Sequence, residues 1–163
     1  MKLTSRIFLL LFFLPALWAC SQKTFDEMAN DMAGKSPIVR STEIKDSMEQ
    51  YVLLDSREKE EYQVSHIAGS RWVGYDNFDL AQLNDLPKDS KIVVYCSVGY
   101  RSGKVVEKLM KSGFSNVQNL WGGIFYWVNM GYEVENEKGV TPDIHPYSAK
   151  WGKWLNKGTK KYE

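Results

Sequence analysis

The sequence predicts an α/β domain built on an open parallel sheet with helices on both faces. Short apolar runs alternate with segments of helical character along most of the chain, which is the order produced by parallel strands joined through right-handed crossovers. The runs at residues 52–54 and 92–95 are apolar without interruption, as expected for strands buried on both faces. No internal repeat or low-complexity segment breaks this order, which favours a single domain.

The first 19 residues differ in character from the rest. Lys2 and Arg6 precede an uncharged apolar run at residues 7–17. This run has the length of a signal-peptide core and is too short to span a bilayer, which needs roughly 20 residues. About 144 residues then remain, enough for one domain with a hydrophobic core.

The end of this segment is similar to the lipobox of bacterial lipoproteins, because the small Ala19 precedes Cys20. Trp18 departs from that pattern, since a smaller residue is usual there. We expect residues 1–19 to be a lipoprotein signal peptide and Cys20 to carry lipid. The protein would then be anchored to a membrane of the bacterial cell envelope and face the periplasm or the exterior. An ordinary signal peptide or an uncleaved anchor is the alternative.

The charge and the cysteines narrow the class of function. Without Lys2 and Arg6, 19 of the 21 basic residues remain against 20 acidic ones, a net charge near −1. This balance excludes the basic footprint of a nucleic-acid-binding protein, so we expect no nucleic-acid partner. With Cys20 lipidated, Cys96 would be the one free thiol of the mature chain, and an unpaired thiol in an oxidising compartment points to a reactive role.

The first half of the chain is expected to alternate as follows. Residues 20–36 are polar and are expected to be a tether between the lipid and a domain at 37–134. Strands are expected at 38–39 and 52–55, and helices at 41–48 and 58–63. Residues 67–73 are expected to carry a turn at Gly69 and another strand.

The second half begins with the strongest strand, residues 92–95, and Cys96 follows at its carboxyl end. A loop at 97–100 and a helix at 102–112 come next, with Gly113 as the C-cap. A strand at 116–120, a break at the double glycine 122–123 and a helix at 124–129 complete the domain.

Residues 135–163 form an extension in which the alternation stops. It contains Trp151 and Trp154 together with Lys150, Lys153, Lys157, Lys160 and Lys161. One interpretation is that the aromatic residues pack onto the domain and the lysines remain in water. The other is that the extension contacts an acidic partner or lipid headgroups near the anchor.

Cys96 is the candidate nucleophile. Ligands of α/β sheets gather at the carboxyl ends of strands, and backbone N–H groups of residues 97–102 can turn inward to hold an anion. The positive end of the following helix and Arg101 favour the thiolate over the thiol, while Gly99 permits a tight loop. These features predict an activated sulfur in an oxyanion-type cradle. The alternative is a small buried core residue.

Three motifs follow one another in order along the chain. They are Asp55-Ser56-Arg57 with Glu61-Tyr62 and His66-Ile67-Ala68-Gly69-Ser70, then Cys96-Ser97-Val98-Gly99-Tyr100-Arg101-Ser102, and finally Leu120-Trp121-Gly122-Gly123-Ile124 with Trp127 and Gly131. Together they resemble the rhodanese-like domain family of single-domain sulfurtransferases, over about residues 38–134. The resemblance implies the rhodanese fold, a persulfide intermediate on Cys96 and no cofactor or metal.

The resemblance also assigns roles to single residues. The residues expected to hold the persulfide and the substrate anion are Ser97, Val98, Gly99, Tyr100 and Arg101. Four residues are expected to support the site: Asp55, Arg57, His66 and Trp121. Among these, Arg57 is expected from its spacing to pair with Glu61, and Trp121 is expected to line the pocket rim. His66 is expected to make structural hydrogen bonds, with a role as acid or base as the alternative. Trp127 is expected in the core.

The implied reaction moves a sulfane sulfur from a donor such as thiosulfate or a polysulfide to a thiol or protein acceptor. Ser97 stands where the best-known thiosulfate-using members carry a cation, which speaks against thiosulfate. An external acceptor is required because the mature chain has no second thiol. Two other classes remain open, namely a binding or sulfur-carrier module and a cysteine phosphatase or arsenate reductase. The last is disfavoured because only four residues separate Cys96 from Arg101, which is a narrow loop for a tetrahedral oxyanion.

Overall fold

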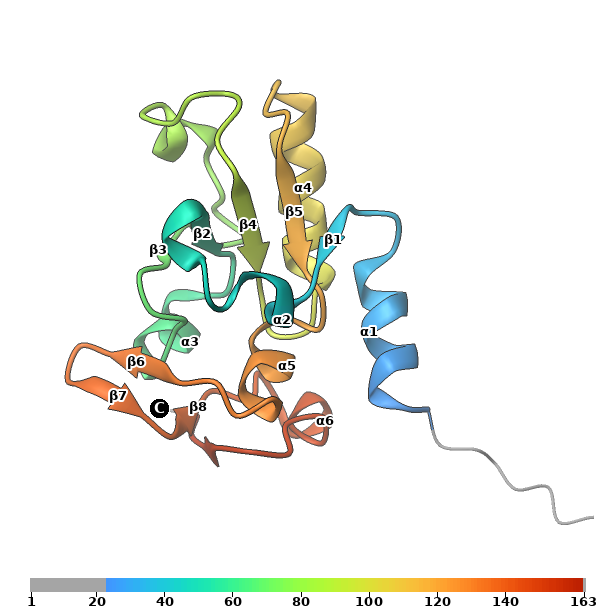
Figure 1. The fold of residues 1–163 in the computed structure, drawn as a ribbon. Coiled ribbons are helices and arrows are strands. Elements are labelled where there is room, and N and C mark those ends of the chain that lie inside the picture. Colours follow the sequence, from blue (N-terminus) through green and yellow to red (C-terminus); the bar gives the residue numbers. More distant parts are fainter. Residues whose placement is uncertain (1–22, 163) are drawn as a thin grey trace, which may run out of the picture.

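A five-stranded parallel sheet forms the centre of the computed structural model, which describes residues 23–162 (Figure 1). Its strand order is β1-β5-β4-β2-β3, and every neighbouring pair is parallel. The strands are β1 Ile38–Val39, β2 Val52–Asp55, β3 Arg71–Trp72, β4 Ile92–Tyr95 and β5 Val117–Leu120. The predicted fold class is confirmed.

Both faces of the sheet are buried. In β4, Ile92 and Val94 pack into one hydrophobic cluster with Leu109 of α4 (Tyr100–Lys111). Val93 and Tyr95 pack into a second cluster on the opposite face, which contains residues of α2 (Ser41–Ile44) and α5 (Gly123–Asn129). Successive side chains of a strand point to opposite faces, so the unbroken apolar run of β4 is explained by two buried faces.

The carboxyl ends of the central strands point toward the C-terminal elements. In Figure 1 the arrows of β4 and β5 run toward α5 and the elements that follow it. Helix α3 (Lys59–Val64) follows β2, and two 3₁₀ turns lie at Met48–Gln50 and Leu80–Leu83. The strand expected at 67–73 is reduced to Arg71–Trp72, because a turn closed by Ser70 N–H and Ile67 O precedes it.

The tether expected for residues 20–36 is wrong over α1 (Phe25–Ala33), which is a packed helix. A capping box starts it: Thr24 accepts from Glu27 N–H, and Glu27 accepts from Thr24 N–H. Met28 is 3% exposed and joins the same cluster as the core of α5. The apolar spacing of Phe25, Met28, Ala29, Met32 and Ala33 is that of an amphipathic helix, which the polar composition of the segment concealed.

The extension also packs onto the domain. The hairpin of β6 (Val134–Asn136) and β7 (Gly139–Thr141) is followed by β8 (Asp143–Ile144), α6 (Ala149–Gly152) and β9 (Thr159–Lys160). Ile144 and Leu155 are buried in the α5 cluster, and Trp151 and Trp154 pack against it. This is the arrangement that the first interpretation predicts, and contact with lipid or a partner stays a prediction.

The signal peptide and Cys20 lie outside the described residues. Between Lys23 and Tyr162 no helix is both long and apolar enough to cross a membrane.

Candidate functional site

Cys96 lies directly after β4, at the carboxyl edge of the sheet. Its side chain is buried, with 1% of the residue exposed. Gly99 N–H donates to Cys96 Sγ at 3.2 Å, and Ser102 Oγ lies 3.4 Å from the same sulfur. Gly99 has φ +111°, a left-handed conformation that a side chain rarely tolerates. The loop therefore directs a backbone donor at the sulfur, as the sequence predicts.

The beginning of α4 supplies further donors. The helix starts at Tyr100, two residues earlier than expected, and its first backbone hydrogen bond joins Gly103 N–H to Gly99 O at 3.1 Å. The N–H groups of the first turn have no partner inside a helix, and the helix dipole makes this end positive. Thus the expected residues 97–101 are brought around Cys96, at the end of the helix that favours an anion.

Asn119 on β5 hydrogen-bonds to the loop and helix start that follow Cys96. It is fully buried, donates to Gly99 O at 2.9 Å and accepts from Ser102 Oγ at 2.7 Å. Its amide also donates to Ser36 Oγ at 3.0 Å. Sequence reasoning did not identify Asn119 as a site residue, and it considered Ser102 only for its backbone N–H group. The available signal was an amide in an otherwise buried strand, because buried amides need hydrogen-bond partners.

The double glycine closes the other side of the loop. Ile124 N–H donates to Cys96 O at 2.9 Å, and Phe125 N–H donates to Ser97 O at 3.1 Å. A Cβ on Gly123 would lie 2.3 Å from Cys96 O. Only glycine permits this approach of α5 to the loop.

Glu61 of α3 pairs with Arg101 of α4. Arg101 Nη1 and Nη2 donate to the two carboxylate oxygens at 2.6 and 2.9 Å, and Ser97 Oγ donates to Glu61 at 2.9 Å. Burial alone would raise the pKa of Glu61, but the hydrogen bonds and charge of Arg101 lower it overall. Burial alone would lower the pKa of Arg101, but the hydrogen bonds and charge of Glu61 have the larger effect, so the pKa of Arg101 is raised. Both groups are therefore charged, and each compensates the other.

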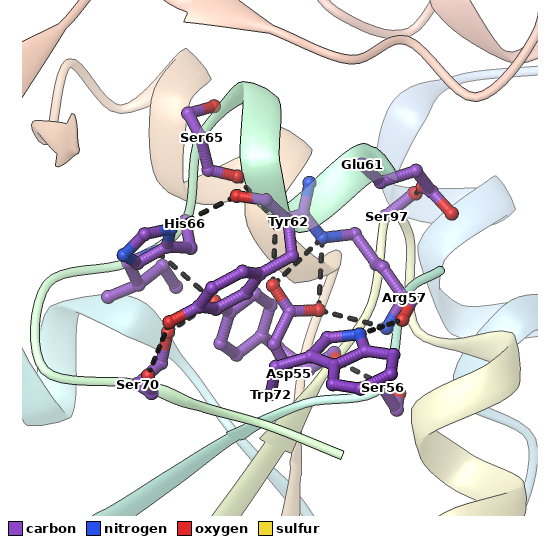
Figure 2. A network of polar contacts seen from close by, with 12 residues as sticks. Asp55, Ser56, Arg57, Glu61, Tyr62, Ser65, His66, Ser70, Trp72 and Ser97 are labelled. Atoms are coloured by element: carbon purple, nitrogen blue, oxygen red, sulfur yellow. Dashed lines mark hydrogen bonds and ion pairs between the residues drawn. The ribbon is translucent and has the colours of Figure 1, made fainter. Parts of the chain in front are cut away.

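The expected Arg57–Glu61 pair is wrong. Arg57 instead binds Asp55, with Nη2 and Nε at 2.6 and 3.0 Å from the carboxylate oxygens, and donates to Ser65 O at 2.6 Å (Figure 2). Burial disfavours the charge on Arg57, but Asp55 outweighs this effect and raises the pKa of Arg57. Residues four apart meet on a helix, but Arg57 precedes α3, which begins at Lys59. The pair therefore fastens the loop after β2.

His66 makes the structural contacts expected of it. Its Nδ1 is 3.0 Å from Tyr62 O, its ring stacks on Tyr62 with centroids 3.9 Å apart, and its backbone pairs with Glu135. Figure 2 shows His66 and Tyr62 side by side, on the far side of the Asp55–Arg57 pair from Ser97.

Trp121 does not line the pocket rim, so that prediction is wrong. It is fully buried, and its Nε1 donates to Asn30 Oδ1 of α1 at 2.8 Å. The guanidinium of Arg40 lies 3.9 Å from its ring centroid. The tryptophan turns inward because α1 supplies a partner for its N–H group. Trp127 is in the core, as predicted.

A cavity of about 310 Å³ opens beside Cys96. Its lining residues are Met32, Cys96, Ser97, Val98, Tyr100, Arg101, Tyr147 and Trp151. Met32 comes from α1, while Tyr147 and Trp151 come from the extension. Sequence reasoning placed none of these three at the site.

The family model of the Rhodanese-like domain matches residues 41–130, which is more than half of the chain. The chain belongs to the rhodanese-like domain family. The loop of Cys96 and the Glu61–Arg101 pair fall within the matched rhodanese-like segment. The three cavity residues from α1 and the extension fall outside it.

Solved structures agree with the rhodanese-like assignment. A rhodanese-related protein from Thermoplasma volcanium is 30% identical with a TM-score of 0.56, over 62% of this chain and 99% of that one. A protein from Bacillus halodurans is 28% identical with a TM-score of 0.56, over 64% and 80% of the two chains.

Curated relatives match part of this chain and differ from one another in their named functions. The probable adenylyltransferase/sulfurtransferase MoeZ of Mycobacterium tuberculosis is 30% identical over 71% of this chain and 28% of its own length. A sulfurtransferase of Allochromatium vinosum is 36% identical over 36% of this chain and 54% of its own length. A tRNA uridine(34) hydroxylase of Listeria welshimeri is 30% identical over 62% and 34% of the two chains. The chain spans less than two thirds of each, and membership of the family supports sulfurtransferase-type activity.

Proposed function

We propose that this protein is a sulfurtransferase in which Cys96 accepts a sulfane sulfur as a persulfide and passes it to a thiophilic acceptor. The observation that carries this proposal is the Gly99 N–H group, which is 3.2 Å from Cys96 Sγ at the start of α4. Donors aimed at sulfur stabilise a thiolate and a thiolate-like persulfide. The four-residue loop between Cys96 and Arg101 leaves room for a single sulfur rather than a phosphate.

The transfer is a nucleophilic substitution. The Cys96 thiolate attacks the outer sulfur of the donor, the donor's S–S bond breaks, and a new S–S bond forms on Cys96. With thiosulfate the leaving group is sulfite, and with a polysulfide it is the shortened polysulfide. The loop N–H groups hold the negative charge on the outer sulfur of the persulfide, and no net oxidation or reduction occurs.

Release of the sulfur requires an external acceptor. Among residues 23–162, Cys96 is the one cysteine, so no neighbouring thiol in this part of the chain attacks the persulfide. A small thiol, cyanide or a cysteine of a partner protein would take the outer sulfur and return Cys96 to the thiolate.

The test is to incubate the full chain in detergent with thiosulfate and, separately, with a polysulfide, and to measure the mass of the peptide that contains Cys96. We expect a gain of one sulfur atom that cyanide removes and that Cys96→Ser lacks. Peptide mapping separates Cys96 from Cys20. No gain with either donor would favour a non-catalytic binding module. Turnover of an aryl phosphate that Cys96→Ser abolishes would favour a phosphatase.

We further propose that Cys20 anchors the protein by lipid in the bacterial envelope, on the periplasmic or outer side of a membrane. Support comes from the sequence around residues 1–20. The expected result is that the wild type sediments with membranes, whereas Cys20→Ala is released or left unprocessed. Equal solubility of the two forms would count against the anchor.

A further inference from the structure

The walls of the cavity beside Cys96 are largely apolar. Met32, Val98, Tyr100, Tyr147 and Trp151 supply most of the lining. The volume of about 310 Å³ is at the lower end of the range of small-molecule sites, about 300–1,000 Å³. The cavity is therefore larger than a lone sulfur needs, and it has the character of a site for an organic group.

The charge at the cavity is compensated. Arg101 is the one charged residue among those that line it, and both of its terminal nitrogens are bound to Glu61. The ring of Tyr147 lies 4.8 Å from the guanidinium. A small dianion such as thiosulfate would leave water for an apolar wall without meeting an uncompensated cation, which is unfavourable.

Tyr147 is held in an unusual backbone conformation. Its φ of +61° is the one left-handed value of a non-glycine residue in the described part of the chain. Such strain persists only where surrounding contacts impose it, and it is concentrated at functional positions. Tyr147 N–H donates to His145 Nδ1 at 3.1 Å, and Ser148 N–H donates to Pro146 O at 2.7 Å. This bend places a half-exposed ring at the mouth of the cavity.

We infer that the extension gives this rhodanese-like domain its specificity, because Tyr147 and Trp151 make the cavity a site for the apolar group of an organic persulfide donor, R–S–SH. The inference rests on the proposed function and names its donor class. Aromatic walls bind apolar groups by area burial and ring contacts. The donor's outer sulfur then meets Cys96 while R lies between Met32, Tyr147 and Trp151.

The reaction balances without a further reagent. The Cys96 thiolate attacks the outer sulfur of R–S–SH, the S–S bond of the donor breaks, and R–S⁻ is displaced as a thiolate. Cys96–S–SH forms first, and its proton then passes to the displaced thiolate, which leaves as R–SH. The negative charge that Cys96 brought stays on the outer sulfur of the Cys96 persulfide, where the loop N–H groups hold it.

The experiment compares benzyl persulfide, methyl persulfide and thiosulfate as donors to the full chain in detergent. The second-order rate of Cys96 persulfidation is measured, and each persulfide rate is divided by the rate of the same donor with free N-acetylcysteine. We expect the corrected rate with benzyl persulfide to exceed that with methyl persulfide by about tenfold, and thiosulfate to be the slowest. Equal corrected rates, or fastest loading by thiosulfate, would overturn the inference and leave the persulfide enzyme intact. No loading by any donor would overturn the proposed function itself.

Variants locate the specificity. Tyr147→Asn removes the ring at a residue type that tolerates a left-handed backbone, and it should lower the ratio of the benzyl rate to the methyl rate about three- to tenfold. Tyr147→Phe should keep the preference, and Trp151→Leu should lower it. Tyr162→Asn is the matched control, because Tyr162 is exposed to the same degree (50% against 49%) on the same extension but does not line this cavity. An unchanged preference in both Tyr147→Asn and Trp151→Leu would contradict the assignment.

Discussion

Arg101 and Glu61 form a two-pronged ion pair that ties the first turn of α4 to α3, with nitrogen–oxygen distances of 2.6 and 2.9 Å. Ser97 adds its hydroxyl to the same carboxylate. Two residues of the loop around Cys96 are thus fixed to one buried acid. The loop is therefore fixed in place, and the charge of Arg101 is compensated by Glu61. The donors available to the sulfur are backbone N–H groups rather than a free cation.

Glu61→Gln should destabilise the protein and slow the loading of Cys96. Removing one charge of a buried pair leaves the other uncompensated, so we expect a loss toward the lower end of about 3–5 kcal/mol, measured by chemical denaturation. Asp85→Asn is the matched control, because Arg71 and Asp85 also form a two-pronged pair, at 3.1 and 3.1 Å, but in an exposed position. That pair should contribute about 0–1 kcal/mol. Equal losses in the two variants would show that the buried pair has no special weight.

The stability contributed by the Glu61–Arg101 pair should disappear in acid. The folded state lowers the pKa of Glu61 below its ordinary value of 4.5, so the unfolded chain takes up a proton first. The contribution is fully present above the ordinary value and is lost as the pH falls through the lowered one. The free energy of unfolding of wild type and Glu61→Gln should differ most at neutral pH, and the difference should shrink as the pH falls below the ordinary value of 4.5. A difference that grew on acidification would contradict the assigned direction.

Gly123→Ala should distort the Cys96 loop. The added Cβ would lie 2.3 Å from Cys96 O, at a left-handed φ of +56°. Gly113→Ala is the control, because Gly113 has φ +89° with nothing within 4 Å of an added Cβ. The control should lose about 1–2 kcal/mol from backbone strain, whereas Gly123→Ala should lose more and load sulfur more slowly. Thermal denaturation and the loading rate check this, and identical behaviour of the two variants would argue against close packing of α5 on the loop.

Met28→Ala should destabilise the domain, because α1 is part of its core. Met28 is 3% exposed, and shortening a buried methionine costs about 2–5 kcal/mol. Asp31→Ala, on the exposed side of the same helix, should change the free energy of unfolding by about 0.5 kcal/mol or less. A tether would give no difference between the two variants.

The sheet could be predicted from the sequence because its signals are local. The unbroken apolar run at Ile92–Tyr95 and the cysteine that follows it locate the central strand and the site edge. The Cys96 loop was also predictable, since the loop and the helix start are contiguous in the chain.

The partners of the site residues could not be predicted, because they join distant segments. Glu61 and Arg101 are far apart in the chain, so no local pattern connects them. The four-residue spacing of Arg57 and Glu61 predicted a pair, but residues at this spacing meet only when both lie in one helix, and Arg57 lies before α3. Trp121 turned inward because of Asn30, in a segment whose polar composition hid an amphipathic helix. Tyr147 reaches the cavity through a left-handed bend at a residue type that gives no sequence signal for it.

The central claim is that Cys96 carries sulfur from a donor to an acceptor. The most direct measurement uses a donor with a radioactive outer sulfur, isolates the loaded protein, and adds an excess of a small thiol. We predict that the label is on the Cys96 peptide before the thiol is added and on the thiol afterwards, and that Cys96→Ser carries none. Label that never enters the Cys96 peptide, or that stays there in the presence of thiol, would contradict a sulfurtransferase.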